Sequence, residues 1–207
     1  NQVRQLSRIK IETMDTTSIN LQELQLWVGE QNYLDAPSNS FILTGSTKSL
    51  TDIYSSAILT LVGSPTFDTN GINLTGSQYI TIPQSILGFG LNDFTISLWV
   101  TSNDNYNSGY QHLLSLGYNS SNYVLINIQN NSNRYIEIND GSTTTSTFTY
   151  PNDSISHNYI ISRKQGKIIL FIDGIQKIEK SNSNNLPLQD YHIGYSLPHN
   201  GGFYLHG

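Results

Sequence analysis

The chain has 207 residues, enough for one large domain or for one domain with a piece of another. Its formal net charge is −5 and only 12% of its residues are charged, which argues against binding to nucleic-acid phosphates. It contains no cysteine, which excludes disulfides, thiolate metal sites and cysteine nucleophiles. No apolar run reaches the roughly 18 residues of a membrane-spanning helix, so we expect no membrane insertion.

Short runs of alternating apolar and polar residues dominate the chain, and Gly, Asn, Asp and Ser interrupt them. Residues 19–27 fit a helix or a strand, and we predict a strand. In FTISLWV, residues 94–100, Phe94 and Ile96 share one face and Trp99 lies on the other. Further strands are predicted at SRIKIE (7–12), YVLINI (123–128), RYIEI (134–138), NYIISR (158–163) and KIILFI (167–172).

Turn residues separate these predicted strands. Asp173-Gly174 and Asp140-Gly141 are strong hairpin signals, because both central positions of the tight turn favour positive φ, and Gly166 marks another turn. Many short strands joined by hairpins, without a repeat of 20–50 residues, predict an all-β sandwich or barrel.

From about Leu50 onward, the order of the segments resembles that of laminin G-like, concanavalin A-like lectin domains. The most specific segment is NDFTISLWV, with an aromatic residue followed by small and apolar residues and then Trp99. The resemblance implies an antiparallel two-sheet jelly-roll β-sandwich over residues 50–207. The other segments are SLTDIYSS (49–56), GSPTFDTNGINLTGSQYITIP (63–83), HLLSLGY (112–118), NYIISRKQGKIILFIDGIQ (158–176) and YHIGYS (191–196).

The first part of the chain does not fit that domain. Residues 1–32 resemble the closing strands of a discoidin-like, galactose-binding domain, which needs on the order of 100 residues to bury a core. They are therefore the end of an upstream domain, or strands added to the following sandwich or to a neighbouring chain. We predict a linker over residues 33–49.

The end of the chain, GGFYLHG at residues 201–207, resembles the entrance to one more strand of the laminin G-like pattern. An unpaired edge strand is a liability in a free protein. We therefore expect the last strand of the sandwich to come from the rest of a longer polypeptide or from a neighbouring chain.

Glycoside hydrolases share this sandwich and need two carboxylates about 5–9 Å apart. Glu137 and Asp140 form the nearest pair, but three positions along a strand place them on opposite faces. The five histidines show no close pairing for a metal site, and no nucleophile elbow, phosphate-binding loop or dinucleotide motif is present. We predict a module that is not an enzyme, with a glycoside hydrolase as the disfavoured alternative.

The resemblance favours carbohydrate binding, in which planar aromatic rings stack on sugars and neighbouring polar groups bind hydroxyls. Three loops carry such residues: NDNYNSGY (103–110), GYNSSNY (117–123) and GYSLPHNGGFY (194–204). For any one tyrosine, the alternative is that it covers a strand end with its hydroxyl in water. The predicted sugar-binding residues are Asn105, Tyr106, Asn107, Tyr110, Tyr118, Tyr123, Tyr195 and His199.

Calcium is a further expectation from the resemblance, since a hard cation takes several oxygen ligands from loops. The candidate ligands are Asp52, Asp68 and Asp104. Asp68, in FDTNG, also fits a turn residue that caps its own backbone.

The composition indicates where such a module works. A neutral surface rich in Asn, Ser and Tyr, without cysteine, favours a virion-surface or extracellular protein. We expect part of a larger capsid, fibre or decoration protein, whose partners are glycans or neighbouring structural subunits. The alternative is a purely structural cement domain with no glycan ligand.

Overall fold

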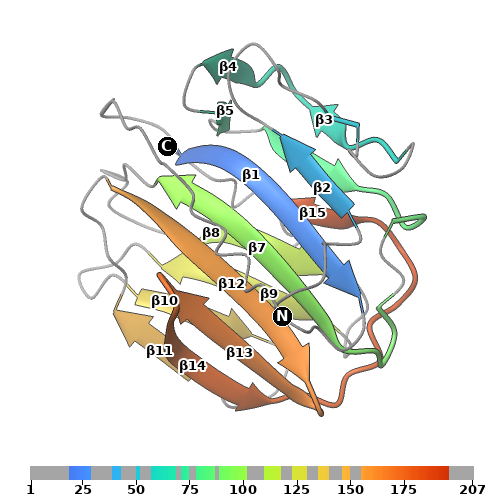
Figure 1. Ribbon diagram of the computed structural model, residues 1–207, viewed down its shortest axis with the longest axis vertical. Coiled ribbons are helices and arrows are strands. Elements are labelled where there is room, and N and C mark those ends of the chain that lie inside the picture. Colours follow the sequence, from blue (N-terminus) through green and yellow to red (C-terminus); the bar gives the residue numbers. More distant parts are fainter. Residues whose placement is uncertain are drawn as a thin grey trace, which may run out of the picture.

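The chain forms two antiparallel β-sheets stacked face to face (Figure 1). Within the described residues all regular structure is strand, which confirms the all-β, antiparallel jelly-roll sandwich; none of these residues forms a helix able to cross a membrane. The computed structural model describes residues 19–28, 39–42, 50–51, 57–68, 71–74, 78–86, 89–101, 110–117, 123–129, 135–139, 146–149 and 155–195.

The sheet that faces the viewer in Figure 1 is called the front sheet. Its strands, in spatial order, are β14 (Ile175–Ser181), β13 (Lys167–Ile172), β12 (Ser156–Lys164), β7 (Phe94–Thr101), β1 (Ile19–Val28), β5 (Gly71–Leu74) and β4 (Thr66–Asp68), with β2 (Asn39–Ile42) paired to β1.

The other sheet is called the back sheet. Its strands, in spatial order, are β11 (Ser146–Thr149), β10 (Tyr135–Asn139), β9 (Val124–Gln129), β8 (Tyr110–Leu116), β15 (Tyr191–Ile193), β6 (Tyr79–Ile82) and β3 (Thr60–Val62).

The core lies between the two sheets and follows the alternation of the sequence. In β7, Phe94 and Ile96 are fully buried and Trp99 is half-buried on the outer face, as predicted. Burial of each such apolar side chain contributes about 1.5–3 kcal/mol. The back sheet contributes Ile80, Ile82, Leu114, Leu116, Val124, Ile126, Tyr191 and Ile193 to the same core.

Two-residue turns join β12 to β13 and β13 to β14. Gln165 and Gly166 have φ of 49° and 73°, and Asp173 and Gly174 have φ of 52° and 76°. Positive φ at both central positions is the conformation that an Asp-Gly pair favours in a tight hairpin. The predicted turns at Gly166 and Asp173-Gly174 are confirmed, whereas the predicted strand at 7–12 and the Asp140-Gly141 turn lie outside the described residues.

β1 lies inside the front sheet, between β7 and β5, so the strand predicted at residues 19–27 is confirmed. The position of β1 agrees with the alternative in which strands from residues 1–32 are added to the sandwich that follows them. Nothing in the described part of residues 1–32 supports the resemblance to a discoidin-like domain. Within the predicted linker at 33–49, Asn39–Ile42 form the short strand β2, because their backbone pairs with β1; the linker itself stays a prediction. The other domain boundaries stay predictions.

Arg163 closes one end of the sandwich. Its side chain is the last one on β12 that points into the core, and only 2% of the residue is exposed. Its Nε donates to the carbonyl of Asn92 (2.8 Å), Nη1 to that of Asn184 (3.0 Å) and Nη2 to that of Gly90 (2.7 Å). These carbonyls belong to the segments before β7 and after β14. One buried side chain therefore ties two connecting loops to β12.

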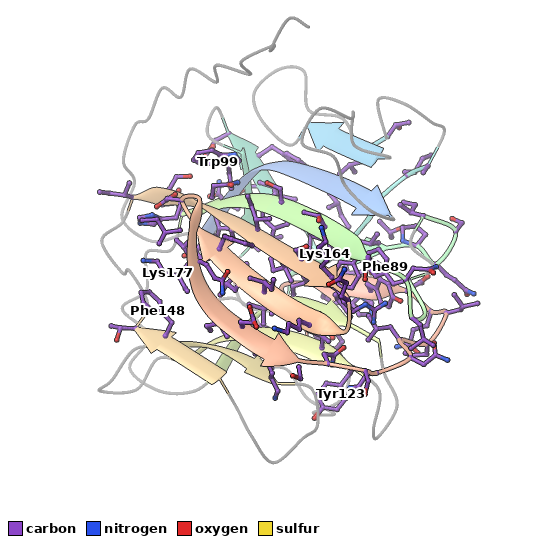
Figure 2. All side chains as sticks on the ribbon, turned by 60° about the horizontal axis from the view of Figure 1, so that its bottom comes forward. Phe89, Trp99, Tyr123, Phe148, Lys164 and Lys177 are labelled. Atoms are coloured by element: carbon purple, nitrogen blue, oxygen red, sulfur yellow. The ribbon has the colours of Figure 1, made fainter. Side chains whose placement is uncertain are left out.

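Three stacked aromatic rings accompany Arg163. Phe89 stacks on Phe94 of the front sheet (4.1 Å between centroids) and on Tyr191 of the back sheet (5.4 Å), and the guanidinium lies 5.0 Å from the Phe94 centroid. Burial raises the pKa of Tyr191 to about 12, so its hydroxyl stays protonated and donates to the Pro187 carbonyl. We call Arg163, Phe89, Phe94 and Tyr191 the end plug; Figure 2 shows Phe89 and Trp99 towards opposite ends.

We expect Arg163→Met to lower the free energy of unfolding by about 3 kcal/mol, because it leaves several buried carbonyls without a donor. Urea denaturation followed by tryptophan fluorescence measures the change. Lys164→Met, at the exposed neighbouring position, is the control and should change stability by less than about 0.5 kcal/mol. Equal effects of the two substitutions would contradict the role of Arg163.

Candidate ligand-binding site

The predicted sugar-binding residues that the structure describes lie at two different ends of the sandwich. One end holds the end plug, and we call the other, where β7 finishes, the Thr101 end. β15 runs from Tyr191 in the plug towards Tyr195, and β8 runs antiparallel to it, so β8 starts with Tyr110 at the Thr101 end. Tyr195 and the start of β8 therefore lie at the same end.

Tyr123 lies at the opposite end. Its carbonyl accepts a hydrogen bond from the Asn184 side chain (3.3 Å), and Asn184 is also bound to Arg163. The structure therefore places Tyr123 and Tyr195, which belong to two of the three predicted loops, at opposite ends of the sandwich. Figure 2 shows Tyr123 well away from Trp99. The other predicted residues, Asn105, Tyr106, Asn107, Tyr118 and His199, lie outside the described residues.

Tyr195 belongs to a compact group of rings on the outer face of the back sheet. Its ring is stacked on Tyr79, with centroids 4.6 Å apart and planes at 17°. His192 meets both rings edge to face, at 5.5 Å from Tyr79 and 5.6 Å from Tyr195. We call Tyr79, His192 and Tyr195 the aromatic cluster. It joins Tyr79 of β6 to His192 of β15 and to Tyr195, two residues after the end of β15.

Local sequence explains why these side chains face outward. In β6, Ile80 and Ile82 are buried in the core, so Tyr79 and Thr81 point the other way. In β15, Ile193 faces the core and His192 is paired with Thr81. Alternation in YITIP and YHIGY could have identified Tyr79 and His192, but only the pairing of β6 with β15 brings them together.

His192 is the titratable group of the aromatic cluster. It is 7% exposed, and its Nδ1 lies 3.3 Å from the Thr81 hydroxyl oxygen. Burial lowers the pKa of His192 below its usual 6.5, and the negative charge of Asp190 raises it in part. The imidazole is therefore neutral at pH 7. The exposed Asp190 is itself held by a hydrogen bond from the Gln84 backbone N–H (2.8 Å).

At the Thr101 end of the front sheet, an acid–imidazole pair holds the hairpin between β13 and β14. His157 Nδ1 lies 2.6 Å from Asp173 Oδ2, and the Asn158 N–H donates to Asp173 Oδ1 (2.9 Å). The Asn158 amide donates to the Ser97 hydroxyl (3.0 Å). Both Asp173 oxygens are thus engaged within the chain, and the arrangement fixes the hairpin against β12.

The calcium expectation does not fit Asp68. Its Oδ1 accepts from the Gly71 N–H (3.1 Å) and its Oδ2 from the Asn73 amide (2.8 Å), so Asp68 caps the turn between β4 and β5. Among the residues that the structure describes, no group of three or more His, Asp or Glu could hold a metal ion. Asp52 and Asp104 lie outside that part of the chain, and calcium binding there stays a prediction.

The profile of the concanavalin A-like lectin/glucanases superfamily matches residues 74–204, more than half of the chain. The chain belongs to this superfamily. This confirms the resemblance drawn from NDFTISLWV and the neighbouring segments. A comparison with curated proteins finds no match.

Solved structures show the same fold at low sequence identity. Domain 4 of AbnA, an extracellular arabinanase from Geobacillus stearothermophilus solved with arabinotriose, has a TM-score of 0.52 and 13% identity over 87% of each chain. Domains LG4-5 of the mouse laminin α1 chain give 0.46 and 15% over 77% of this chain and 40% of theirs. Tailspike protein 2 of bacteriophage CBA120 gives 0.47 and 13% over 97% and 29%. The chain thus spans well under half of the laminin and tailspike structures.

The lowered pKa of His192 has a consequence for stability. Below about pH 6.5 the unfolded chain binds a proton at this position more readily than the folded chain does, so acid lowers the free energy of unfolding. We expect urea denaturation at pH 7 and pH 5 to show a smaller decrease for His192→Gln than for the unaltered chain. An equal decrease in both proteins would contradict the burial of a neutral imidazole.

Proposed function

We propose that this chain is a non-catalytic carbohydrate-binding module that binds glycans at the Thr101 end, with the aromatic cluster as its described contact surface. The observation that carries the proposal is the parallel stack of Tyr79 and Tyr195 on the outer face of the back sheet. Two of the predicted sugar-binding residues, Tyr110 and Tyr195, belong to this end.

The chemistry of the aromatic cluster suits a sugar. An aromatic ring offers a flat apolar face, while its hydroxyl and the Thr81 hydroxyl are hydrogen-bonding groups at the edge. The two edge-to-face contacts of His192 hold Tyr79 and Tyr195 in place before a ligand arrives. Such preorganisation reduces the entropy lost on binding.

A structural neighbour supports the same class of function. The arabinanase domain, whose TM-score is 0.52, was solved in complex with arabinotriose. In that enzyme, a sandwich of this kind is a domain that was found bound to a carbohydrate. At 13% identity, no residue role is carried over from it.

We further propose that the module belongs to a larger virion-surface protein, such as a capsid, fibre or decoration protein. The support is compositional: only 12% of the residues are charged, none is cysteine, and the polarity comes from hydroxyl and amide side chains. A surface of this kind favours contacts with host glycans and with neighbouring subunits.

A second candidate function is a structural cement domain without a glycan ligand. It is favoured by large apolar side chains that the described surface exposes by 57–68%. Packing of such side chains against neighbouring subunits would remove them from water. They are Ile58, Leu91, Ile175 and Leu188.

We expect Tyr195→Ala and Tyr79→Ala each to weaken glycan binding about tenfold, the loss of roughly 1.4 kcal/mol of stacking free energy. A glycan array identifies the ligand, and titration calorimetry measures the affinities. Tyr123→Ala, at the opposite end, is the matched control and should bind like the unaltered chain. A chain that binds no glycan but self-associates in sedimentation experiments would favour the cement function instead.

We also expect no hydrolysis of the glycan that the module binds. Glu137 lies on β10, in register with Asn127 and Thr147. In the sequence, it belongs to the pair of acidic residues whose spacing comes nearest to that of a glycosidase. Incubation with bound oligosaccharides, followed by mass spectrometry, should show no shortened product. Product formation that disappears in Glu137→Gln would establish a glycoside hydrolase.

A further inference from the structure

The electrostatic surroundings of the aromatic cluster bear on which glycans it accepts. His192 carries no charge at pH 7, for the reasons given above. Asp190, two residues before His192, is exposed and acts on it with its negative charge. Among the described residues, the groups that act on one another at the cluster are the two tyrosine rings, the neutral imidazole, the Thr81 hydroxyl and the Asp190 carboxylate.

Three of the described cations of the front sheet, Arg163, Lys167 and Lys177, are engaged in contacts within the sandwich. Arg163 is buried in the end plug, where backbone carbonyls accept its N–H groups. Lys167 is paired with Glu179 (2.5 Å), and the Lys177 ammonium lies 4.7 Å from the centroid of the Phe148 ring. Figure 2 shows Lys177 and Phe148 side by side, where β14 meets β11.

We infer that the aromatic cluster selects neutral glycans over sulfated, sialylated or uronic-acid glycans. This inference rests on the proposed carbohydrate-binding function and names its ligand class. A carboxylate or sulfate placed beside Tyr195 would lose hydration and meet the negative charge of Asp190. A neutral sugar loses no charge hydration and keeps the stacking and hydroxyl contacts.

The geometry of Asp190 allows its charge to be removed without removing its structural contact. Asp190 Oδ1 accepts the hydrogen bond from the Gln84 N–H. An asparagine side chain has a carbonyl oxygen that can accept the same bond. Asp190→Asn therefore changes the charge at the aromatic cluster and preserves the acceptor that holds the segment before β15.

Biolayer interferometry of the whole chain against immobilised polysaccharides tests the inference. The neutral probes are arabinan, galactan, mannan and laminarin, and the anionic probes are heparin, polygalacturonate and polysialic acid. We expect at least one neutral probe to bind at least tenfold more tightly than every anionic probe. Raising the salt concentration from 0.05 to 0.5 M shortens the Debye screening length about threefold, and it should leave this binding unchanged.

The variants connect that binding to the aromatic cluster. Tyr195→Ala should reduce binding of the neutral probe about tenfold, whereas Tyr123→Ala should not. Asp190→Asn should keep neutral binding within about twofold and should increase any residual anionic binding. Thermal denaturation of each variant checks that it is folded.

Two outcomes would overturn the inference in distinguishable ways. Salt-sensitive binding of an anionic probe that is lost in Tyr195→Ala would overturn the ligand class and leave carbohydrate binding intact. Failure of the folded chain to bind any probe would overturn the proposed function together with the ligand class.

Discussion

The buried guanidinium of Arg163 is the interaction on which the arrangement of the sandwich depends. A guanidinium presents five N–H donors in a fixed plane, and here they meet carbonyls of Asn92, Asn184 and Gly90 from two different loops. Burial lowers the pKa of Arg163, while interactions with Tyr191 and Asp93 raise it. Because the partners are neutral carbonyls rather than a carboxylate, this contact fixes backbone positions: it sets where β7 starts and how the chain returns from β14 to β15.

The short strand β15 connects the end plug, whose backbone positions Arg163 fixes, to the aromatic cluster. Tyr191 and Ile193 point into the core, and Tyr191 is held by its stack with Phe89 in the end plug. The alternation of a strand then places His192 on the outer face, against Thr81 of β6. Gly194 follows with φ of 88°, a conformation that side chains disfavour, and the chain turns so that the Tyr195 ring stacks on Tyr79. The three residues of β15 thus link the buried end plug to the aromatic cluster, in which Tyr79 and Tyr195 are half-buried and His192 is buried.

Local features of this chain were predictable from sequence, and long-range ones were not. The alternation around Phe94 and the hairpin at Asp173-Gly174 depend on neighbouring residues, so sequence alone predicts them. The insertion of β1 between β7 and β5 depends on partners far along the chain. The contact of Thr81 with His192 spans 111 positions, and local composition says nothing about it. For the same reason, the composition of two tyrosine-bearing loops does not reveal that Tyr123 and Tyr195 lie at opposite ends of the sandwich.

Three of the described cations make contacts within the sandwich. Arg163 holds loops, Lys167 is paired with Glu179, and Lys177 lies over Phe148, so each of these charges serves a contact within the sandwich. The glycan recognition that we propose for the aromatic cluster would then depend on ring faces and hydroxyl groups, whose interactions are little affected by dissolved ions. Such contacts are individually weak, and a module of this kind gains avidity from being repeated. On the virion surface that we propose as its location, many copies of the module would be present, so modest affinity at each cluster would suffice for attachment.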